Sequence, residues 1–491
     1  MGLMRFRVFP TERITEEMVQ QAYLSGFDRE SWPVRVEVAG DTLILERSVS
    51  DSGNLHVPWL VEGHGRLTLA SGSLMERIEP YLLPLEIARG TIVQVRNQFS
   101  EWQSLGLSVP EAVPAKISDA VGRFSLAAVS QDDLATSADH AEAALCLALD
   151  AGEMMVAAFT EQAMAVRHRS EGKLTSLLGA DLSDILMDDH IAQQLLLTFN
   201  AAQTPLCWRE IETTEGTYSW SISDKQIKWG RANGLKVLGG PLLMLDPHAL
   251  PDWLYLFEGD FDNLLDFISG YVRKVVQRYR GKVDAWICAG RVNAVEALSI
   301  SEQERLRLIA RIVELVQSLD PETPALVSFD QPWAEYMRQE ESDFPPLHFA
   351  DALIRAGSGV SGLMLEINVG YSPGGSLLRH PLEFNRLLDI WSSFGLPLWL
   401  SLCAPSSDIE DPLAQHKTTV SPGVWSAAAQ QAWVARFVSL SLVKTSVQGV
   451  LWNQLLDSHL HEFPNGGLFD ERGQAKPVLS AFAAIRQAHL K

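Results

Sequence analysis

The sequence predicts an α/β protein: a (β/α)8 barrel preceded by a small β-sandwich-like domain and two long helices. The barrel is expected in the later part of the 491-residue chain, where short apolar runs alternate with amphipathic helical segments. This alternation is typical of parallel βα units, and about eight such units in about 310 residues favour a closed barrel over an open sheet. The sequence contains no GxGxxG motif or phosphate loop, which argues against a nucleotide-binding Rossmann domain.

Residues 1–75 are predicted to be β-rich. Val34–Val38 alternates apolar and polar residues, Gly40-Asp41 provides a two-residue hairpin turn, and Leu43–Leu45 returns as the second strand. Two further strands are expected at Leu55–Leu60 and Arg66–Leu69. We interpret this region as a structural domain, with a carbohydrate-binding module as the alternative.

Residues 76–170 are predicted to form two long helices. The first has an apolar stripe from Tyr81 to Trp102 with alternating spacings of four and three, and Gly106 ends it. The second stripe runs from Leu145 to Val166. Such stripes are usually packing faces, and a homodimer seam is the alternative. A polar stretch, His168–Lys173, then leads into the third predicted domain, residues 174–491.

Eight segments are candidates for the barrel strands. The two weaker ones are Leu174–Gly179 and Pro205–Trp208. The six clearest are apolar runs that fit buried parallel strands: Lys236–Leu242, Val283–Cys288, Ala325–Phe329, Gly362–Ile367, Leu396–Leu402 and Val447–Trp452.

The chain is acidic, with 40 Lys and Arg against 61 Asp and Glu, a net charge of −21. Such a surface repels phosphate backbones and anionic lipids, so neither nucleic acid nor a membrane is expected as a partner. We find no signal peptide and no uncharged apolar span of membrane length, which predicts a cytoplasmic protein. The four cysteines lack CxxC spacing and indicate neither a disulfide framework nor a zinc site. No metal or other cofactor is expected.

Four stretches resemble the glycoside hydrolase family 10 enzymes, the xylanase family, and occur in that family's order. The resemblance implies a (β/α)8 barrel and, by analogy, hydrolysis of O-glycosyl bonds. The matching stretches are Phe199–Asp224 around the second strand, Asn233–Trp253 around the third, Tyr279–Trp286 before the fourth, and Gly449–Pro477 at the eighth strand and C-terminal closure.

Both catalytic carboxylate positions of that family differ in this chain. Retaining hydrolysis needs two carboxyl groups about 5–5.5 Å apart. The family's acid/base Glu ends the motif Trp-Asp-Val-Val-Asn-Glu, and the corresponding stretch here is Trp286-Ile-Cys-Ala-Gly-Arg291. Arginine stays protonated at neutral pH and cannot donate that proton. The family's nucleophile on strand seven corresponds to Leu402 or a neighbour, and no carboxylate occurs from Phe394 to Ser407.

Residues that grip the sugar in the family have also changed, since Glu366 and Asn368 stand where it has Gln and His. The active sites of such barrels lie at the C-terminal ends of the strands. The candidate ligand-binding residues that we place there are Trp208, Asp246, Arg291, Asp330, Trp333, Glu366, Asn368, Trp452 and Asp457.

Glu366 is the most informative of these candidates, because an unpaired charge inside an apolar strand is costly. Strands four and six flank strand five, so we expect a buried ion pair between Glu366 and Arg291. The alternative is a ligand-contacting or displaced catalytic carboxylate, acting with Asp330. Asp330 could equally serve as a helix cap or loop hydrogen-bond partner. Trp452 could be a platform under a sugar ring or a core residue.

Three functions remain open on this reasoning. The first is a catalytically degenerate family 10-like protein that binds a carbohydrate or another small ligand at the barrel mouth. The second is a diverged, xylanase-like hydrolase with relocated carboxylates Glu366 and Asp330. The third is a non-catalytic assembly scaffold. The fold alone does not decide between them.

Overall fold

The structure is a computed structural model that describes residues 2–26, 29–186, 188–294, 297–338, 344–372, 374–418 and 424–491. The chain divides into two compact units. Unit 1 comprises Met1–Val166 together with Trp333–Ser342 and Leu377–Leu387. Unit 2 comprises Arg167–Pro332, Asp343–Ser376 and Leu388–Lys491. Two segments that lie within the predicted barrel region of the sequence therefore belong to the N-terminal unit.

Unit 1 contains two four-stranded sheets with the orders β4-β5-β1-β8 and β3-β2-β6-β7. The predicted hairpin is confirmed, because β4 and β5 pair antiparallel around Gly40-Asp41. Apolar residues of both sheets share one buried core, to which Phe6, Leu45 and Trp59 contribute. The strands are β1 Gly2–Arg7, β2 Tyr23–Ser25, β3 Ser31–Trp32, β4 Val34–Ala39, β5 Thr42–Arg47, β6 Asn54–Val61, β7 Gly65–Ala70 and β8 Tyr81–Leu82, with the short helices η1 Thr11–Arg13 and α1 Glu16–Gln21.

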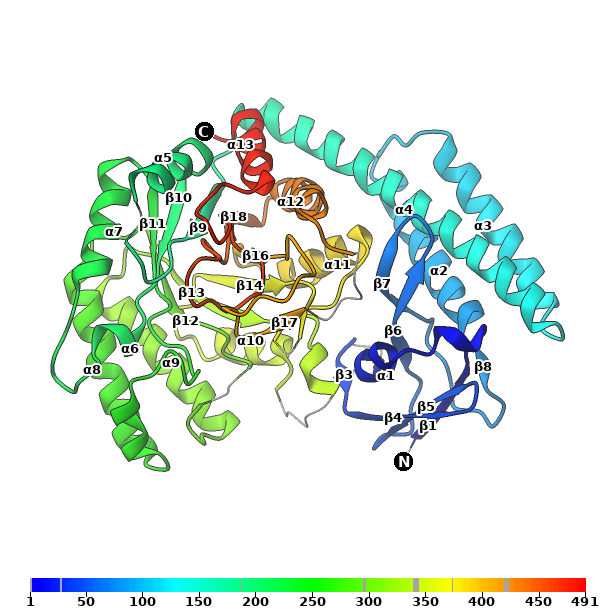
Figure 1. Cartoon of the computed structure of the whole chain (residues 1–491), viewed down its shortest axis with the longest axis horizontal. Coiled ribbons are helices and arrows are strands. Elements are labelled where there is room, and N and C mark those ends of the chain that lie inside the picture. The colour runs from blue at the N-terminus through cyan, green and yellow to red at the C-terminus, as the bar shows by residue number, and fades with distance from the viewer. Residues whose placement is uncertain are drawn as a thin grey trace. The chain divides into compact units, whose positions relative to one another are not determined.

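Three long helices, not two, follow these sheets (Figure 1). They are α2 Leu83–Ser104, α3 Ala112–Val129 and α4 Leu134–Glu171. The first predicted stripe coincides with α2. The prediction missed α3 because the face it buries is small, with Val113, Ala120 and Ala127 as its buried residues.

Helix α4 is long and apolar enough to cross a membrane by length and composition alone. It is the only helix of the described residues that meets those two criteria, and 44% of its most apolar window is buried. Buried core helices of soluble proteins have the same composition, so this finding is weak support for a membrane span.

The two later segments of unit 1 are held there by a buried ion pair. Arg379 donates from Nη2 to Oε1 of Glu335 at 3.0 Å and to the hydroxyl of Tyr23 at 2.7 Å. The side chains of Arg379 and Glu335 are 3% and 0% exposed. A charge buried this deeply needs such a partner, so the pair fixes both segments within the unit.

Unit 2 is a closed barrel of eight parallel strands in the order β10-β11-β12-β13-β14-β16-β18-β9 (Figure 1). The strands are β9 Leu177–Asp181, β10 Ala201–Thr204, β11 Lys236–Gly239, β12 Ala285–Ala289, β13 Ala325–Asp330, β14 Gly362–Asn368, β16 Leu398–Cys403 and β18 Val447–Trp452. The predicted (β/α)8 barrel is confirmed. The second strand was misplaced, since it ends before Pro205 and Trp208 begins a short helix, α6 Trp208–Ile211.

A helix of at least ten residues follows each strand, as a (β/α)8 barrel requires, and the helix after β14 begins in the Leu377–Leu387 segment of unit 1. These helices are α5 Asp189–Thr198, α7 Ser221–Ala232, α8 Phe261–Tyr279, α9 Glu302–Leu319, α10 Pro346–Arg355, α11 Pro381–Ser392, α12 Ala427–Leu442 and α13 Pro477–His489. Shorter elements are η2 Asp252–Phe257, η3 Glu335–Arg338, and the antiparallel pair β15 Tyr371–Ser372 and β17 Lys417–Thr418.

The barrel interior is filled by one residue from most strands, including Ile287, Leu326, Met364, Trp399 and Leu451. Because side chains alternate along a strand, these residues fix which positions face inward at the C-terminal ends. On β14 and β16 the next inward positions are those of Glu366 and Ser401, which lie opposite each other in register.

Candidate functional site

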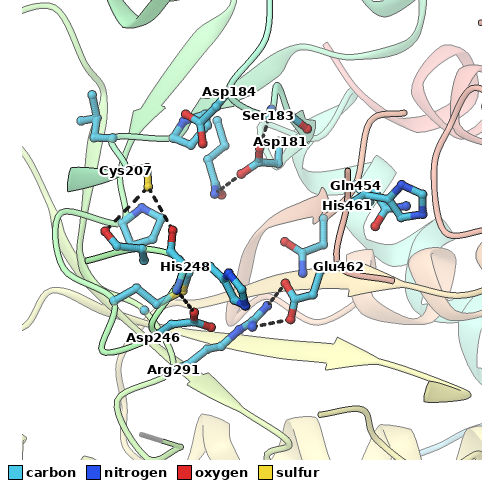
Figure 2. A pocket seen from close by; sticks show the side chains of 18 of the residues that line it. Asp181, Ser183, Asp184, Cys207, Asp246, His248, Arg291, Gln454, His461 and Glu462 are labelled. Carbon is cyan, nitrogen blue, oxygen red and sulfur yellow. Dashed lines mark hydrogen bonds and ion pairs between the residues drawn. The ribbon is translucent and has the colours of Figure 1, made fainter. Parts of the chain in front are cut away.

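A cavity of about 700 Å³ opens at the C-terminal ends of the barrel strands within unit 2. The loops after β9, β10, β11 and β18 form its walls, and inward residues of β12, β14 and β16 contribute to its lining (Figure 2). This is the end of a barrel at which parallel strands place functional side chains.

Arg291 is held at the cavity by two carboxylates. It lies two residues after the end of β12 and has a φ of +50°, a conformation that residues other than glycine seldom adopt. Its Nε lies 2.8 Å from Oε2 of Glu366, so the predicted ion pair is confirmed. Its two terminal nitrogens bind both oxygens of Glu462 at 2.5 and 2.7 Å (Figure 2). Arg291 is therefore the shared partner of two acids, one of which the sequence did not suggest.

Further hydrogen bonds fix the two carboxylates. Ser328 donates to the second oxygen of Glu366 at 2.6 Å, and His416 lies 3.2 Å from Glu462. Burial alone would raise the pKa of Glu462, but the charge of Arg291 and the bonds from His416 and Arg291 outweigh it and hold that pKa at about 2. Glu462 is therefore ionised throughout the physiological pH range.

Asp330 lies beneath this cluster at the end of β13, opposite Glu366 in register. Burial raises its pKa to about 7, while Arg291 opposes that rise. Its backbone exchanges two hydrogen bonds with the Asn293 side chain, and its Oδ1 has no hydrogen-bond partner among the described residues. Asp330 is not among the residues that line the cavity.

On strand seven the residue at the cavity is Ser401, which is 3% exposed. Leu402 is fully buried and does not line the cavity, because the alternation along β16 turns it outward. The sequence assigned this position to Leu402 or a neighbour, and the residue that lines the cavity is the neighbour, Ser401. The neighbouring serine supplies no carboxylate there.

The opposite side of the cavity is acidic, and sequence reasoning missed it. Asp181 ends β9 and accepts hydrogen bonds from the backbone N–H of Ser183 at 2.7 Å and from the Gln203 side chain at 2.5 Å. Burial, with added repulsion from Asp184 and other carboxylates, raises the pKa of Asp181 to about 8. The only indication in the sequence was the apolar run before Asp181. We predicted that this strand ends at Gly179, two residues too early.

Four of the nine candidate ligand-binding residues line the cavity: Trp208, Asp246, Arg291 and Glu366. Trp208 is nevertheless only 2% exposed, because its ring stacks on Tyr271 with 4.7 Å between ring centroids. Asp246 accepts a hydrogen bond from the backbone N–H of His248 in the loop after β11.

Five candidates lie away from the cavity, Asp330 among them. Trp333 belongs to unit 1, where the guanidinium of Arg379 lies 4.9 Å from its ring centroid. Asn368 is fully buried and accepts a hydrogen bond from Asn453. Trp452 is also fully buried and donates to a backbone carbonyl, so it offers no ring face to a ligand.

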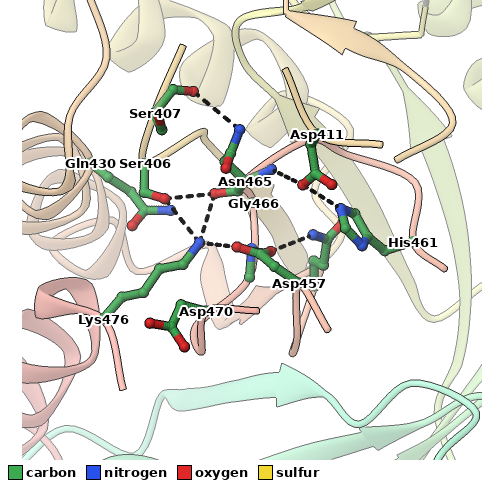
Figure 3. A network of polar contacts seen from close by, with 12 residues as sticks. Ser406, Ser407, Asp411, Gln430, Asp457, His461, Asn465, Gly466, Asp470 and Lys476 are labelled. Carbon is green, nitrogen blue, oxygen red and sulfur yellow. Dashed lines mark hydrogen bonds and ion pairs between the residues drawn. The ribbon is translucent and has the colours of Figure 1, made fainter. Parts of the chain in front are cut away.

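The fifth, Asp457, has a structural role in the loop after β18 (Figure 3). It accepts a hydrogen bond from Nζ of Lys476, and the two side chains are 7% and 8% exposed. Lys476 also donates to Ser406 and to the carbonyl of Asn465, each at 2.9 Å. This network fixes the loop after β18, in which Glu462 lies and from which it binds Arg291.

Comparison with known proteins places the barrel in a family. Residues 186–294 match the model of glycosyl hydrolase family 10. The chain is 30% identical over 120 residues to endo-1,4-beta-xylanase C of Paenibacillus barcinonensis, a match that covers 22% of this chain and 11% of that protein. It is 29% identical over 120 residues to a beta-1,4-xylanase of Dictyoglomus thermophilum, covering 24% and 32% respectively. The matches thus span less than two thirds of these relatives.

Among solved structures, native xylanase 10B of Thermotoga maritima has a TM-score of 0.50 and 16% sequence identity. The superposition covers 65% of this chain and 98% of that one. At this identity the likeness shows the fold alone. Residues 186–294 of this chain are thus similar in sequence to glycosyl hydrolase family 10, and the barrel as a whole has the fold of that xylanase.

Proposed function

We propose that this protein is a non-hydrolytic member of the barrel family that binds a carbohydrate at the mouth of its barrel. One observation carries the proposal. Arg291, which by resemblance occupies the acid/base position, is bonded to both Glu366 and Glu462. A guanidinium fixed in this way neither donates a proton nor leaves its two partners free to act as nucleophiles.

The cavity itself supports binding. Its volume of about 700 Å³ is in the range of small-molecule sites, and its lining mixes apolar residues with convergent polar groups. Strand seven offers Ser401 where the resemblance requires a carboxylate, so the two-carboxylate route lacks a nucleophile as well as an acid.

A relocated active site is the second candidate, and a specific observation favours it. Asp330 and Glu366 lie opposite each other on neighbouring strands, and the pKa of Asp330 is raised to about 7, a value suited to a general acid. It ranks second because Asp330 does not line the cavity and Glu366 is bonded to Arg291 and Ser328.

The experiment measures turnover and binding on the same full-length preparation. We expect no reducing-sugar release from xylan and no hydrolysis of aryl-β-xylosides, together with saturable binding of an oligosaccharide in calorimetry. His248→Trp, which places a large ring at an exposed position of the cavity lining, should weaken that binding without lowering the melting temperature. Hydrolysis that Glu366→Gln abolishes would overturn the proposal in favour of the relocated site.

A further inference from the structure

The charges around the cavity are unbalanced. Among the described residues that line it, Arg291 is the only lysine or arginine, and two carboxylates already bind it. The remaining acidic lining residues are Asp181, Asp184, Glu210 and Asp246. Figure 2 shows Asp181 and Asp184 on a different side of the cavity from Arg291 and Glu462. That side therefore gathers carboxyl groups without an arginine or lysine of the lining to stabilise their ionised forms, and burial raises the pKa of Asp181 to about 8 and that of Asp184 to about 6.

A second feature of this wall points to a ligand. Gln203 is 6% exposed and lines the cavity, and its Nε2 donates to Asp181. Its Oε1 is buried and has no hydrogen-bond partner among the described residues. A buried acceptor left unpaired is unfavourable, so this position favours a ligand that brings a hydrogen-bond donor.

The chemistry of that donor follows from the groups that surround it. Ionised carboxylates and an amide oxygen only accept hydrogen bonds, whereas an ammonium group has three donors, a positive charge and no acceptor. No group of three His, Cys, Asp or Glu side chains in the described part of the chain is arranged to hold a metal ion. An organic cation therefore fits this wall better than a metal ion.

We propose that the wall formed by Asp181, Gln203, Asp184 and Glu210 recognises a protonated amino group, so that the ligand is an amino sugar. This inference rests on the proposed function, since it names the class of carbohydrate that the cavity takes. The apolar side chains beside the wall, among them Leu206 and Leu242, provide the surface for the ligand's carbon skeleton.

The protonation of Asp181 offers an independent readout. Burial and the nearby charges of Asp184 and Glu366 raise the pKa of Asp181 to about 8, so at pH 6.5 the carboxyl holds a proton. An ammonium bound beside it would lower that pKa and displace the proton. Binding should then release up to about one proton per ligand, measurable by calorimetry in two buffers of different ionisation enthalpy.

The test compares two probes that share a skeleton and differ in charge. The β-1,4-linked disaccharide of glucosamine is titrated into the full-length protein, in parallel with its N-acetylated counterpart and with xylobiose. At pH 6.5 and low salt, we expect the amino disaccharide to bind at least about tenfold more tightly than either neutral probe. High salt should shrink this preference, because ions screen partly exposed charges.

Substitutions in the wall test whether its carboxyl groups cause the preference for the amino disaccharide. Asp181→Asn and Asp184→Asn should each remove most of the preference, measured as the ratio of the affinities for the amino disaccharide and its N-acetylated counterpart. Asp262→Asn, on a barrel side chain that is 87% exposed and outside the cavity lining, is the matched control and should change nothing.

The outcomes separate the two proposals. Equal binding of charged and neutral probes overturns the amino-sugar inference and leaves the proposed function standing. A preference that survives both wall variants also overturns it, because the amino group is then recognised elsewhere on this acidic protein. If none of the three probes binds, the inference fails, and a wider glycan screen without any hit would remove the proposed function too.

Discussion

Replacing Arg291 by alanine should destabilise the barrel strongly, and the size of the effect can be worked from its contacts. The side chain makes three charge-assisted hydrogen bonds of 2.5 to 2.8 Å to two carboxylates that are 10% and 27% exposed. Breaking a buried ion pair by removing one partner typically costs about 3–5 kcal/mol. We expect Arg291→Ala to reach this range, because it leaves two neighbouring carboxylates without their cation.

Removing Glu366 in place of Arg291 should lower the free energy of unfolding by less. In Glu366→Ala, Arg291 keeps both bonds to Glu462, so the loss should be about 1.5–3 kcal/mol, the contribution of a hydrogen bond to a charged group. The loss of stability in the double variant should be smaller than the sum of the two single losses. The difference should exceed about 0.5 kcal/mol, the deviation from additivity that independent sites show.

Urea denaturation of the four proteins at pH 7, followed by tryptophan fluorescence, measures these differences. The control is Arg278→Ala, whose ion pair with Asp224 is 39% and 43% exposed and should contribute less than about 1 kcal/mol. Equal losses for Arg291→Ala and Arg278→Ala, or strict additivity of Arg291→Ala and Glu366→Ala, would refute the reasoning.

The charge cluster also predicts how pH acts on the Arg291→Ala variant. With Arg291 present, the pKa of Glu462 is about 2, so this carboxylate stabilises the fold above its unfolded pKa of about 4.3 and loses that contribution as the pH falls through 2. Without Arg291 the buried acids should bind protons more readily. The gap in stability between the variant and the wild type should therefore narrow as the pH falls from about 7 towards 4.

Three further predictions concern other buried charges. Lys476→Met should speed amide exchange in the loop 453–466 and cost about 3–5 kcal/mol, because it leaves Asp457 buried without its cation. Arg379→Leu should destabilise unit 1 by a similar amount, since Glu335 is fully buried. Arg35→Leu, whose ion pair with Glu37 is 74% and 55% exposed, should have a small effect in thermal unfolding. Asp181→Asn should flatten the fall of the melting temperature between about pH 4 and pH 8, because the unfolded carboxyl ionises near 4 while the folded one keeps its proton up to about 8.

The barrel could be predicted from sequence because each strand is a short apolar run and each helix an amphipathic one. The Arg291–Glu366 pair followed from the order of the strands, since β12 and β14 flank β13. The side of the barrel that a residue faces was harder to predict, because it alternates with every position. The sequence therefore left the choice between Leu402 and a neighbour open, and the register of β16 on β14 places Ser401 opposite Glu366.

The rest of the site lies in irregular segments that have no periodic pattern. Glu462 reaches Arg291 from a loop whose path is set by Lys476, Asp457 and the contact of His461 with Asp411 (Figure 3). No helical or strand periodicity in the sequence relates these partners to Glu462, so the sequence does not indicate their contacts. Helix α3 was missed for a related reason, since alanines spaced seven apart bury little apolar area and leave a weak stripe.

These contacts explain why an arginine at position 291 is stable and is not easily replaced by an acid. Arg291 neutralises Glu366 and Glu462 and lies near a third carboxyl, Asp330, whose pKa it holds down. A glutamate at position 291 would add a fourth acid to this cluster and remove its only cation, which buried carboxylates tolerate only by binding protons. An acid at position 291 would thus require the loss of Glu462 and Glu366 together with the change at Arg291. The arginine and the loop glutamate are therefore best understood as a single structural unit, in which neither residue can change without the other.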